Sequence, residues 1–159
     1  MKIYLQKATS VDAQTLLDMQ VRAFFPILEK YKDHETNPAC KSLEYMIERI
    51  NNPSKGFFKI LTGDDNTLVG GIGIKHINSD TVFLGPIFID PAFQNQKFAQ
   101  RALGELENLL QNVKFFELAT IVQEVALVCL YEKIGYVPFG ELKTIQEGMD
   151  IVYLRKKLR

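Results

Sequence analysis

Apolar residues recur along the chain with two different spacings, and the spacing changes from segment to segment. Alternation of apolar and polar residues, or a short apolar run, predicts a strand, whereas recurrence every three or four residues predicts a helix. The predicted strands are residues 2–8, 57–62, 68–77, 81–89, 115–122, 137–142 and 149–156. The predicted helices are residues 13–25, 39–51, 98–112 and 125–134.

Residues that favour caps and turns mark the ends of these segments. Thr9 and Ser10 offer a helix N-cap with Asp12 in the first turn, and Pro26 ends the helical pattern that follows. The turns "GDDN" and "NSD" are short and connect the three middle strands as hairpins. The apolar runs at 115–122 and 125–134 are predicted to be a buried strand and a buried helix.

The element order is therefore β-α-α-β-β-β-α-β-α-β-β in one domain, residues 1–159. Three strands in a meander, followed by a strand-helix-strand crossover, predict a mixed α/β fold with a mostly antiparallel sheet and helices on both faces. A ligand site is expected where the parallel part of the sheet begins, because neighbouring strands leave a crevice there at their carboxyl ends.

Charge and composition narrow the possible functions. Apolar residues make up 47% of the chain and charged residues 24%, as in ordinary globular proteins. The 19 basic and 19 acidic side chains cancel, which disfavours nucleic acid and anionic membranes as partners. The basic run at residues 155–159 is interpreted as a solvated strand end.

The cysteines and histidines give no sign of a disulfide framework or a metal site. Cys40 and Cys129 are far apart, and Cys129 lies in an apolar run that predicts a core position. His34 and His76 lack the spacing to other ligands that metal sites show, so no metal is expected. The N-terminal segment has no apolar signal core and no window is long enough to cross a bilayer, so a cytoplasmic protein is expected.

Two short segments carry candidate chemistry. In "FIDPAFQNQKFAQRALGELE", residues 88–107, a strand passes through a turn into a helix, whose free first amides suit a phosphate group. An ordinary strand-to-helix turn is the alternative. In "LYEKIGYVPFGE", residues 130–141, a helix ends at Gly135, and Tyr131 lies one turn earlier. Tyr131 is either a packed core residue or a general acid for a leaving thiolate.

Together, the two segments resemble the GNAT superfamily of acyl-CoA-dependent N-acetyltransferases, and the element order resembles it over nearly the whole chain. "IFIDPAFQNQKFA" is similar to the family's phosphate loop and the strand end that precedes it, with Gln94 at the first loop position and Ala99 at the last. "LYEKIGY" is similar to the family's second signature, and the tyrosine that commonly acts as general acid falls on Tyr131.

The resemblance implies an acetyl-CoA site in a crevice between splayed strands. The backbone of residues 87–89 would bind the pantetheine arm, and the amides of the loop would hold the pyrophosphate. Direct attack by a primary amine is implied, with Tyr131 protonating the CoA sulfur and no acyl-enzyme on Cys129. The implied cofactor-binding residues are Ile87, Phe88, Ile89, Gln94, Asn95, Gln96, Lys97, Phe98, Ala99 and Gln100.

The chain departs from the family pattern at three points. Lys97 replaces the usual loop glycine, "VQEV" replaces an asparagine often found before the second helix, and "TVFLGPIFI" lacks a glutamate that would serve as base. Glu124 and, less strongly, Asp90 are candidate bases, with solvated or capping roles as the alternative. These departures leave open a catalytically idle acyl-CoA-binding domain. A mixed α/β domain for another phosphate ligand is a further alternative.

The acceptor is an amine of unidentified kind: a small molecule, a peptide N-terminus or a lysine. In the family, the first two helices and their connection line the acceptor groove, and homodimers are common. The corresponding residues here are Phe24, Phe25, Tyr31, His34, Glu35 and Tyr45, which equally suit a packed helical hairpin.

Overall fold

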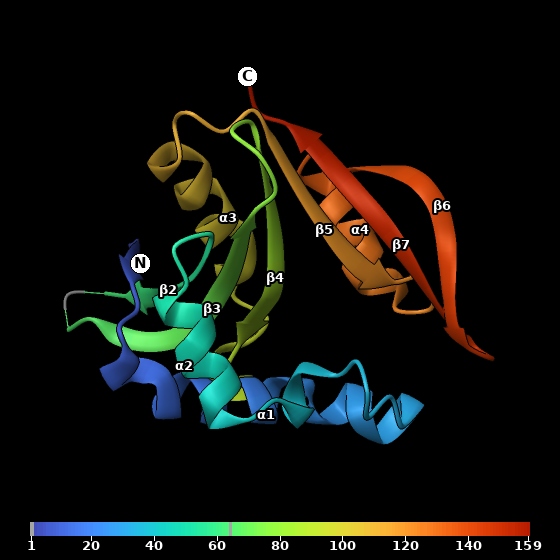
Figure 1. Ribbon diagram of the computed structural model, residues 1–159, viewed down its shortest axis with the longest axis horizontal. Coiled ribbons are helices and arrows are strands. Elements are labelled where there is room, and N and C mark those ends of the chain that lie inside the picture. The colour runs from blue at the N-terminus through green and yellow to red at the C-terminus, as the bar shows by residue number, and fades with distance from the viewer. Residues whose placement is uncertain (1, 64) are drawn as a thin grey trace.

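One seven-stranded sheet runs through the molecule in the order β1-β2-β3-β4-β5-β7-β6 (Figure 1). The computed structural model describes residues 2–63 and 65–159. All neighbouring strands are antiparallel except β4 and β5, which are parallel. The strands are β1 (Ile3–Lys7), β2 (Lys55–Thr62), β3 (Thr67–His76), β4 (Thr81–Ile89), β5 (Phe115–Ile121), β6 (Val137–Gln146) and β7 (Met149–Lys157).

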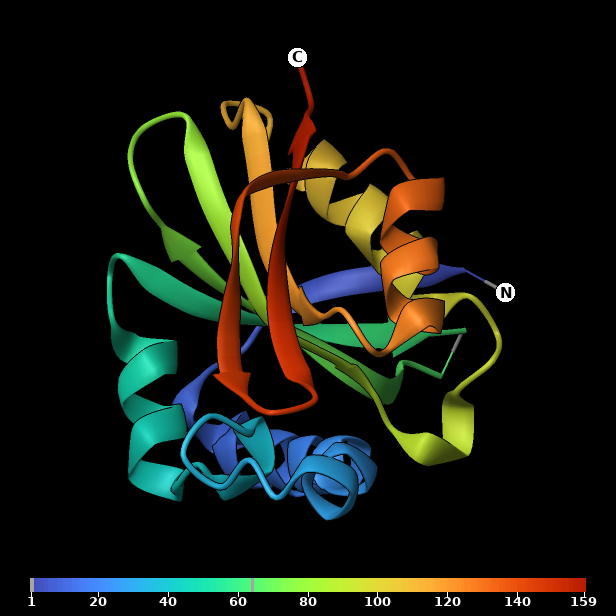
Figure 2. The ribbon, with the colours of Figure 1, turned by 90° about the vertical axis from the view of Figure 1, so that its right-hand side faces the viewer.

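Four α-helices cover the two faces of this sheet (Figure 2). Helices α1 and α2 pack on one face, and α3 and α4 pack on the other. The mixed α/β fold class and the predicted element order are confirmed. The helices are α1 (Ala13–Tyr31), α2 (Leu43–Asn51), α3 (Phe98–Leu109) and α4 (Val125–Lys133), with short 3-10 turns at Ser10–Asp12, Pro38–Cys40 and Pro91–Phe93.

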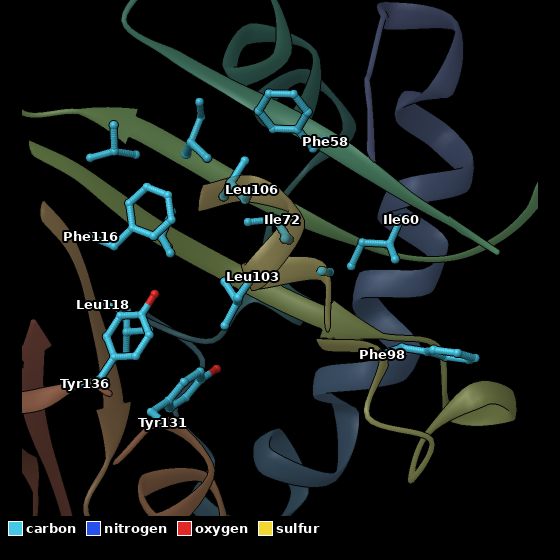
Figure 3. Close-up of a cluster of buried hydrophobic side chains, with 14 of the residues drawn as sticks. Phe58, Ile60, Ile72, Phe98, Leu103, Leu106, Phe116, Leu118, Tyr131 and Tyr136 are labelled. Carbon is cyan, nitrogen blue, oxygen red and sulfur yellow. The ribbon is translucent and has the colours of Figure 1, made fainter. Parts of the chain in front are cut away.

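The hydrophobic core is divided by the sheet, because successive strand side chains point to opposite faces. On the α3 side, Leu103 and Leu106 contact the middle strands and are almost fully buried (Figure 3). On the α1 and α2 side, Leu16 and Met46 pack with Phe57 and Phe88. Phe88 therefore turns its ring toward α1, away from α3.

The prediction that Pro26 ends the first helix is wrong. Helix α1 continues through Pro26 to Tyr31 and closes with Lys32, which is left-handed and donates its amide to the Leu28 carbonyl. Proline in a helix costs one hydrogen bond. Side-chain bonds hold α1 on both sides of it, from Arg22 to Asp90 and from Tyr31 to Glu124. The segment after Pro26 is therefore fixed by tertiary contacts.

Other predicted elements also differ from the structure. The second helix begins at Leu43, because the Ser42 hydroxyl accepts the Tyr45 amide and caps it there. Strand β6 continues to Gln146, paired with β7 across two register shifts. The helix predicted as buried is mostly exposed: in α4 only Tyr131 is buried. Cys129 on α4 is exposed, so its predicted core position is wrong.

Candidate active site

Strands β4 and β5 separate partway along their length, which leaves an opening in the sheet. Their parallel pairing runs from Thr81 and Phe115 to Leu84 and Leu118 and ends there. Beyond this point β4 continues against β3 and β5 continues against β7, and the two strands diverge toward α1 (Figure 1). The predicted splay of parallel strands at their carboxyl ends is confirmed.

The edge of β4 that faces this opening carries backbone groups with no strand beside them. Asp90 donates its amide to the Val69 carbonyl of β3, at 2.8 Å. Because successive amides of a strand point to opposite sides, the amides of Ile87 and Ile89 point away from β3, into the opening. These two residues can therefore hydrogen-bond an extended ligand as a further strand would.

Glycines of β3 bring that strand unusually close to β4. A Cβ on Gly70 would lie 2.1 Å from the Phe88 carbonyl oxygen and 3.1 Å from Ile89 Cα. No side chain fits there without moving the backbone of β4. Glycine at this position thus fixes where the open edge of β4 lies.

The loop after β4 leads into α3 with its first amides free of helical partners. The first bond of the helix runs from the Arg101 amide to the Lys97 carbonyl, at 3.0 Å. The amides of Phe98, Ala99 and Gln100 therefore have no partner within α3, and the helix dipole adds partial positive charge there. The Phe98 ring is buried in the core, so this residue offers the opening only its backbone.

Lys97 adopts the left-handed conformation for which glycine is usual. Its φ is 61°, and Asn95 has a φ of 64°. Asparagine is enriched in this region, whereas a left-handed conformation costs lysine about 1 kcal/mol. Lys97 thus departs from the family pattern in its side chain, while its backbone keeps the left-handed conformation that glycine usually adopts.

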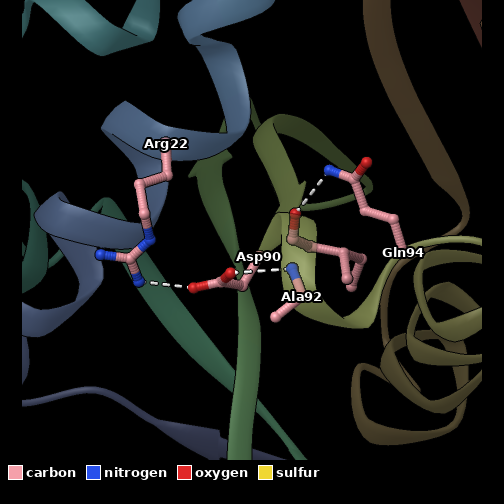
Figure 4. Close-up of polar contacts among 5 residues, drawn as sticks. Arg22, Asp90, Ala92 and Gln94 are labelled. Carbon is pink, nitrogen blue, oxygen red and sulfur yellow. Dashed lines mark hydrogen bonds and ion pairs between the residues drawn. The ribbon is translucent and has the colours of Figure 1, made fainter.

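Side chains tie this loop to β4 and to α1 (Figure 4). Asp90 accepts the Ala92 amide at 3.1 Å and pairs with Arg22 at 2.5 Å, while Gln94 donates to the Ile89 carbonyl at 2.9 Å. Burial acts to raise the pKa of Asp90, but the hydrogen bonds from Arg22 and Ala92 outweigh it and lower this pKa. Asp90 therefore acts here as an ion-pair partner and cap, one of the alternatives to its role as base.

Tyr131 lies on α4, with its ring edge against Tyr136 at a centroid distance of 5.9 Å (Figure 3). Burial raises the pKa of Tyr131 to about 12. The phenol is therefore protonated at neutral pH, which is the form that can donate a proton. Tyr136 is also buried, and its hydroxyl has no hydrogen-bond partner in the described part of the chain.

Glu124 precedes α4 and connects it to the end of α1. Its carboxylate accepts hydrogen bonds from the Lys30 ammonium at 2.7 Å and from the Tyr31 hydroxyl at 2.5 Å. These two bonds lower the pKa of Glu124, against a smaller opposing effect of burial. A carboxylate held in this way is a weak base, and the contacts give Glu124 a structural role.

The residues predicted to line an acceptor groove are not gathered in one place. Phe24 packs against Phe88 with 6.3 Å between ring centroids, and Tyr31 is buried beside Glu124. Phe25, His34 and Glu35 are exposed. Of this set, Tyr45 lines a pocket beside Gly85 and Pro86, near the point where the register of β3 and β4 shifts.

That pocket, which we call the Arg49 pocket, has a volume of about 190 Å³ and lies on the α1 and α2 side of the sheet. It adjoins Gly85 and Pro86, the first residues of β4 beyond its pairing with β5. Sequence reasoning missed it, because Arg49 reads as one of several polar residues on an amphipathic helix. Its lining residues are Gln20, Pro38, Lys41, Tyr45, Met46, Arg49, Phe57, Gly85 and Pro86.

Over residues 2–63 and 65–159, no group of three or more His, Cys, Asp or Glu side chains is placed to hold a metal ion. Within the same ranges, no helix has the length and hydropathy needed to cross a bilayer.

Comparison with known proteins identifies the family. The sequence matches the model of the acetyltransferase (GNAT) family over residues 14–136. No curated protein matches the sequence. Similar solved structures include the spermidine N-acetyltransferase of Vibrio cholerae in complex with CoA and spermine, at 18% identity and a TM-score of 0.77, covering 98% of this chain and 95% of that one.

Two further solved structures share the fold. They are a ribosomal-protein-alanine N-acetyltransferase from Escherichia coli (15% identity, TM-score 0.76, 99% of this chain and 94% of that one) and the PaiA N-acetyltransferase of Thermoplasma acidophilum with coenzyme A (18%, 0.71, 99% of each). Since the family match extends over more than half of the chain, the protein belongs to the GNAT family of acetyltransferases and is an acyltransferase.

Proposed function

We propose that the protein is an N-acetyltransferase that moves an acetyl group from acetyl-CoA to a primary amine by direct attack. The observation that carries this proposal is the open edge of β4, where the amides of Ile87 and Ile89 face a gap that ends at the free amides of α3. The pantetheine arm matches the strand edge, and the pyrophosphate matches the helix N-terminus with the loop from Gln94 to Gln100.

The proposed reaction needs few protein groups. The amine nitrogen attacks the thioester carbonyl carbon, and a main-chain amide of Ile87 or Ile89 hydrogen-bonds the developing oxyanion. The C–N bond forms, the C–S bond breaks, and Tyr131 gives its proton to the leaving sulfur. The phenol of Tyr131, whose pKa is about 12, holds its proton at neutral pH and is therefore in the form that can donate it to the leaving sulfur. The proton lost by the amine passes to solvent.

The test is acetyl transfer to a broad panel of small amines, peptide N-termini and lysine peptides, measured as release of CoA thiol. We expect acetyl-CoA alone to raise the melting temperature, with a stabilisation of about 2.7 kcal/mol at 100 times its Kd. Transfer to at least one class of amine is the expected result. Acetyl-CoA binding without thiol release across the panel would instead support the catalytically idle binding domain.

A further inference from the structure

The Arg49 pocket contains a cation that forms no ion pair with any residue of the described ranges. The Arg49 guanidinium donates through Nη2 to the Gly85 carbonyl at 2.5 Å and to the Ile74 carbonyl at 3.3 Å. None of the ion pairs between residues of the described ranges includes Arg49. Its Nε is buried without an acceptor. Two carbonyl oxygens accept hydrogen bonds from the guanidinium, and Tyr45 and Glu48 favour its charged form without an ion pair being formed.

The sequence is arranged to keep Arg49 in this position. A Cβ on Gly73 would lie 2.9 Å from Arg49 Nη2 and 2.6 Å from the Gly85 carbonyl oxygen, so glycine provides the room for their contact. The guanidinium also lies over the Phe57 ring, at 5.8 Å from its centroid. Burial lowers the pKa of Arg49, against smaller effects of Tyr45 and Glu48. An arginine nevertheless remains charged at neutral pH.

A second cation and an unpaired acceptor complete the lining. Lys41 faces the Tyr45 ring, with its ammonium 4.7 Å from the centroid. Gln20, which is 2% exposed, donates to the Pro38 carbonyl at 2.8 Å, and its side-chain oxygen has no donor. No acidic residue lines the pocket. Arg49 is partly buried, and partial removal of a charge from water is costly when no ion pair offsets it, so this guanidinium favours an added anion.

We propose that the Arg49 pocket holds an anionic group of the acceptor, so that the preferred acceptors are amines that also carry a carboxylate. The inference rests on the proposed function, since the pocket adjoins β4 where the strands separate and the acetyl group would be presented. The guanidinium pairs with the carboxylate, Lys41 adds positive charge at the mouth, and Gln20 can accept a donor hydrogen of the acceptor. A polyamine would instead place a second ammonium group beside the Arg49 guanidinium and the Lys41 ammonium.

The test compares acceptors that differ only at the end remote from the amine. The matched set is 4-aminobutyrate, 4-aminobutanamide and 1,4-diaminobutane, with the corresponding sets of two to six carbons. We expect kcat/KM to be about 10- to 100-fold higher for the carboxylate than for the amide, as charge-assisted hydrogen bonds predict, and lowest for the diamine. Equal use of all three, or preference for the diamine, would overturn the inference while leaving the proposed function intact.

Arg49→Gln removes the charge, and Arg49→Lys keeps it. We expect Arg49→Gln to abolish the preference for the carboxylate and Arg49→Lys to retain part of it, with acetyl-CoA binding unchanged in both. Lys75→Gln, which removes a charge from the exposed end of β3, is the matched control and should keep the preference. A preference that survives Arg49→Gln would contradict the assignment.

Measurements of acceptor binding test the anion site independently of whether the protein transfers acetyl groups. Calorimetry with 4-aminobutyrate and its homologues, on protein saturated with CoA, should detect binding to the natural sequence that Arg49→Gln lacks. Such binding without acetyl transfer would disprove the proposed function but keep the anion site. If the Arg49 variants do not fold, the comparison of acceptors with the natural protein decides the question by itself.

Discussion

At the scale of single residues, the paired tyrosines Tyr131 and Tyr136 allow a matched test of the general acid. We expect Tyr131→Phe to lower kcat about 100-fold or more with little change in the Kd of acetyl-CoA, because it removes a proton donor used only in the transition state. Steady-state kinetics and calorimetry measure the two quantities. Unchanged turnover would exclude Tyr131 from this role.

Tyr136→Phe is the control for that experiment. It removes a hydroxyl from a ring 5.9 Å away that has no hydrogen-bond partner within the described residues. We therefore expect unchanged kcat and a gain of about 1 kcal/mol in the free energy of unfolding, since an unsatisfied buried hydroxyl is lost. In the natural protein, the alkaline limb due to Tyr131 should lie near pH 12 and leave kcat level between pH 8 and about 10.

Lys97 affects two quantities in opposite directions, the stability of the fold and the affinity for CoA, and one substitution measures both. Lys97→Gly should raise the free energy of unfolding by about 0.5 to 1 kcal/mol, because the relief of a left-handed lysine exceeds the added backbone entropy of glycine. Loss of the exposed ammonium should weaken CoA binding about twofold to fivefold, less at high salt. Tighter CoA binding by Lys97→Gly would mean that the lysine obstructs the phosphates.

Lys32→Gly is the matched control for Lys97→Gly. Lys32 is also left-handed, with a φ of 55°, but it lies at the end of α1 rather than in the loop before α3. We expect the same gain in stability without any change in CoA affinity. Chemical denaturation and calorimetry on both variants therefore distinguish backbone strain from the contribution of charge.

At the scale of elements, the contact between β3 and β4 sets the position of the open strand edge. Gly70→Ala should lower the free energy of unfolding by about 3 kcal/mol, because its Cβ would meet the Phe88 carbonyl oxygen and must displace β4. The Kd of acetyl-CoA should rise as well, since β4 carries the amides that face the opening. Urea unfolding and calorimetry measure both effects.

Gly104→Ala serves as the control for this substitution. Nothing lies within 4 Å of a Cβ added at Gly104 on α3. Alanine should therefore stabilise the helix by about 1 kcal/mol and leave acetyl-CoA binding unchanged. If both alanine substitutions had the same effect, the close approach of β3 and β4 would not be the cause.

At the scale of the whole molecule, α1 links the two sides of the opening between β4 and β5. Arg22 pairs with Asp90 after β4, and Tyr31 donates to Glu124 before α4. Gln146 of β6 also donates to the Tyr31 carbonyl, at 2.5 Å. Helix α1 thus bridges the two sides of the crevice through polar contacts from its middle, at Arg22, and from its last residue, Tyr31.

The pairing of Arg22 with Asp90 predicts a dependence of stability on pH. The lowered pKa of Asp90 means that its contribution is fully present above the unfolded pKa, about 3.8, and is lost as pH falls through the folded pKa. We expect Arg22→Gln to be less stable than the natural protein above pH 5. This difference should shrink below about pH 4. Urea unfolding from pH 3 to pH 7 measures it, and a constant difference would contradict the assignment.

The sequence alone was enough to predict the order of the elements and the family. Alternating and helical periodicities are local properties of the sequence. The two segments that resemble the family, around Gln94 and Tyr131, are also short and continuous, so they can be recognised without the structure. The predicted ends of elements were wrong where contacts with residues distant in the sequence determine them. Helix α1 passes Pro26, with Asp90 and Glu124 bonded to it on either side, and α4 buries Tyr131 alone, although its apolar run resembles that of a buried helix.

The parts of the site that depend on more than one segment came from the tertiary structure. Which amides of β4 are free depends on where its pairing with β5 stops, and this follows from packing rather than from the composition of either strand. Arg49 meets Gly85 only because Gly73 leaves room between two strands and a helix. Local patterns therefore determined the fold and the reaction class, whereas the proposed anion site at Arg49 depends on contacts between residues far apart in the chain.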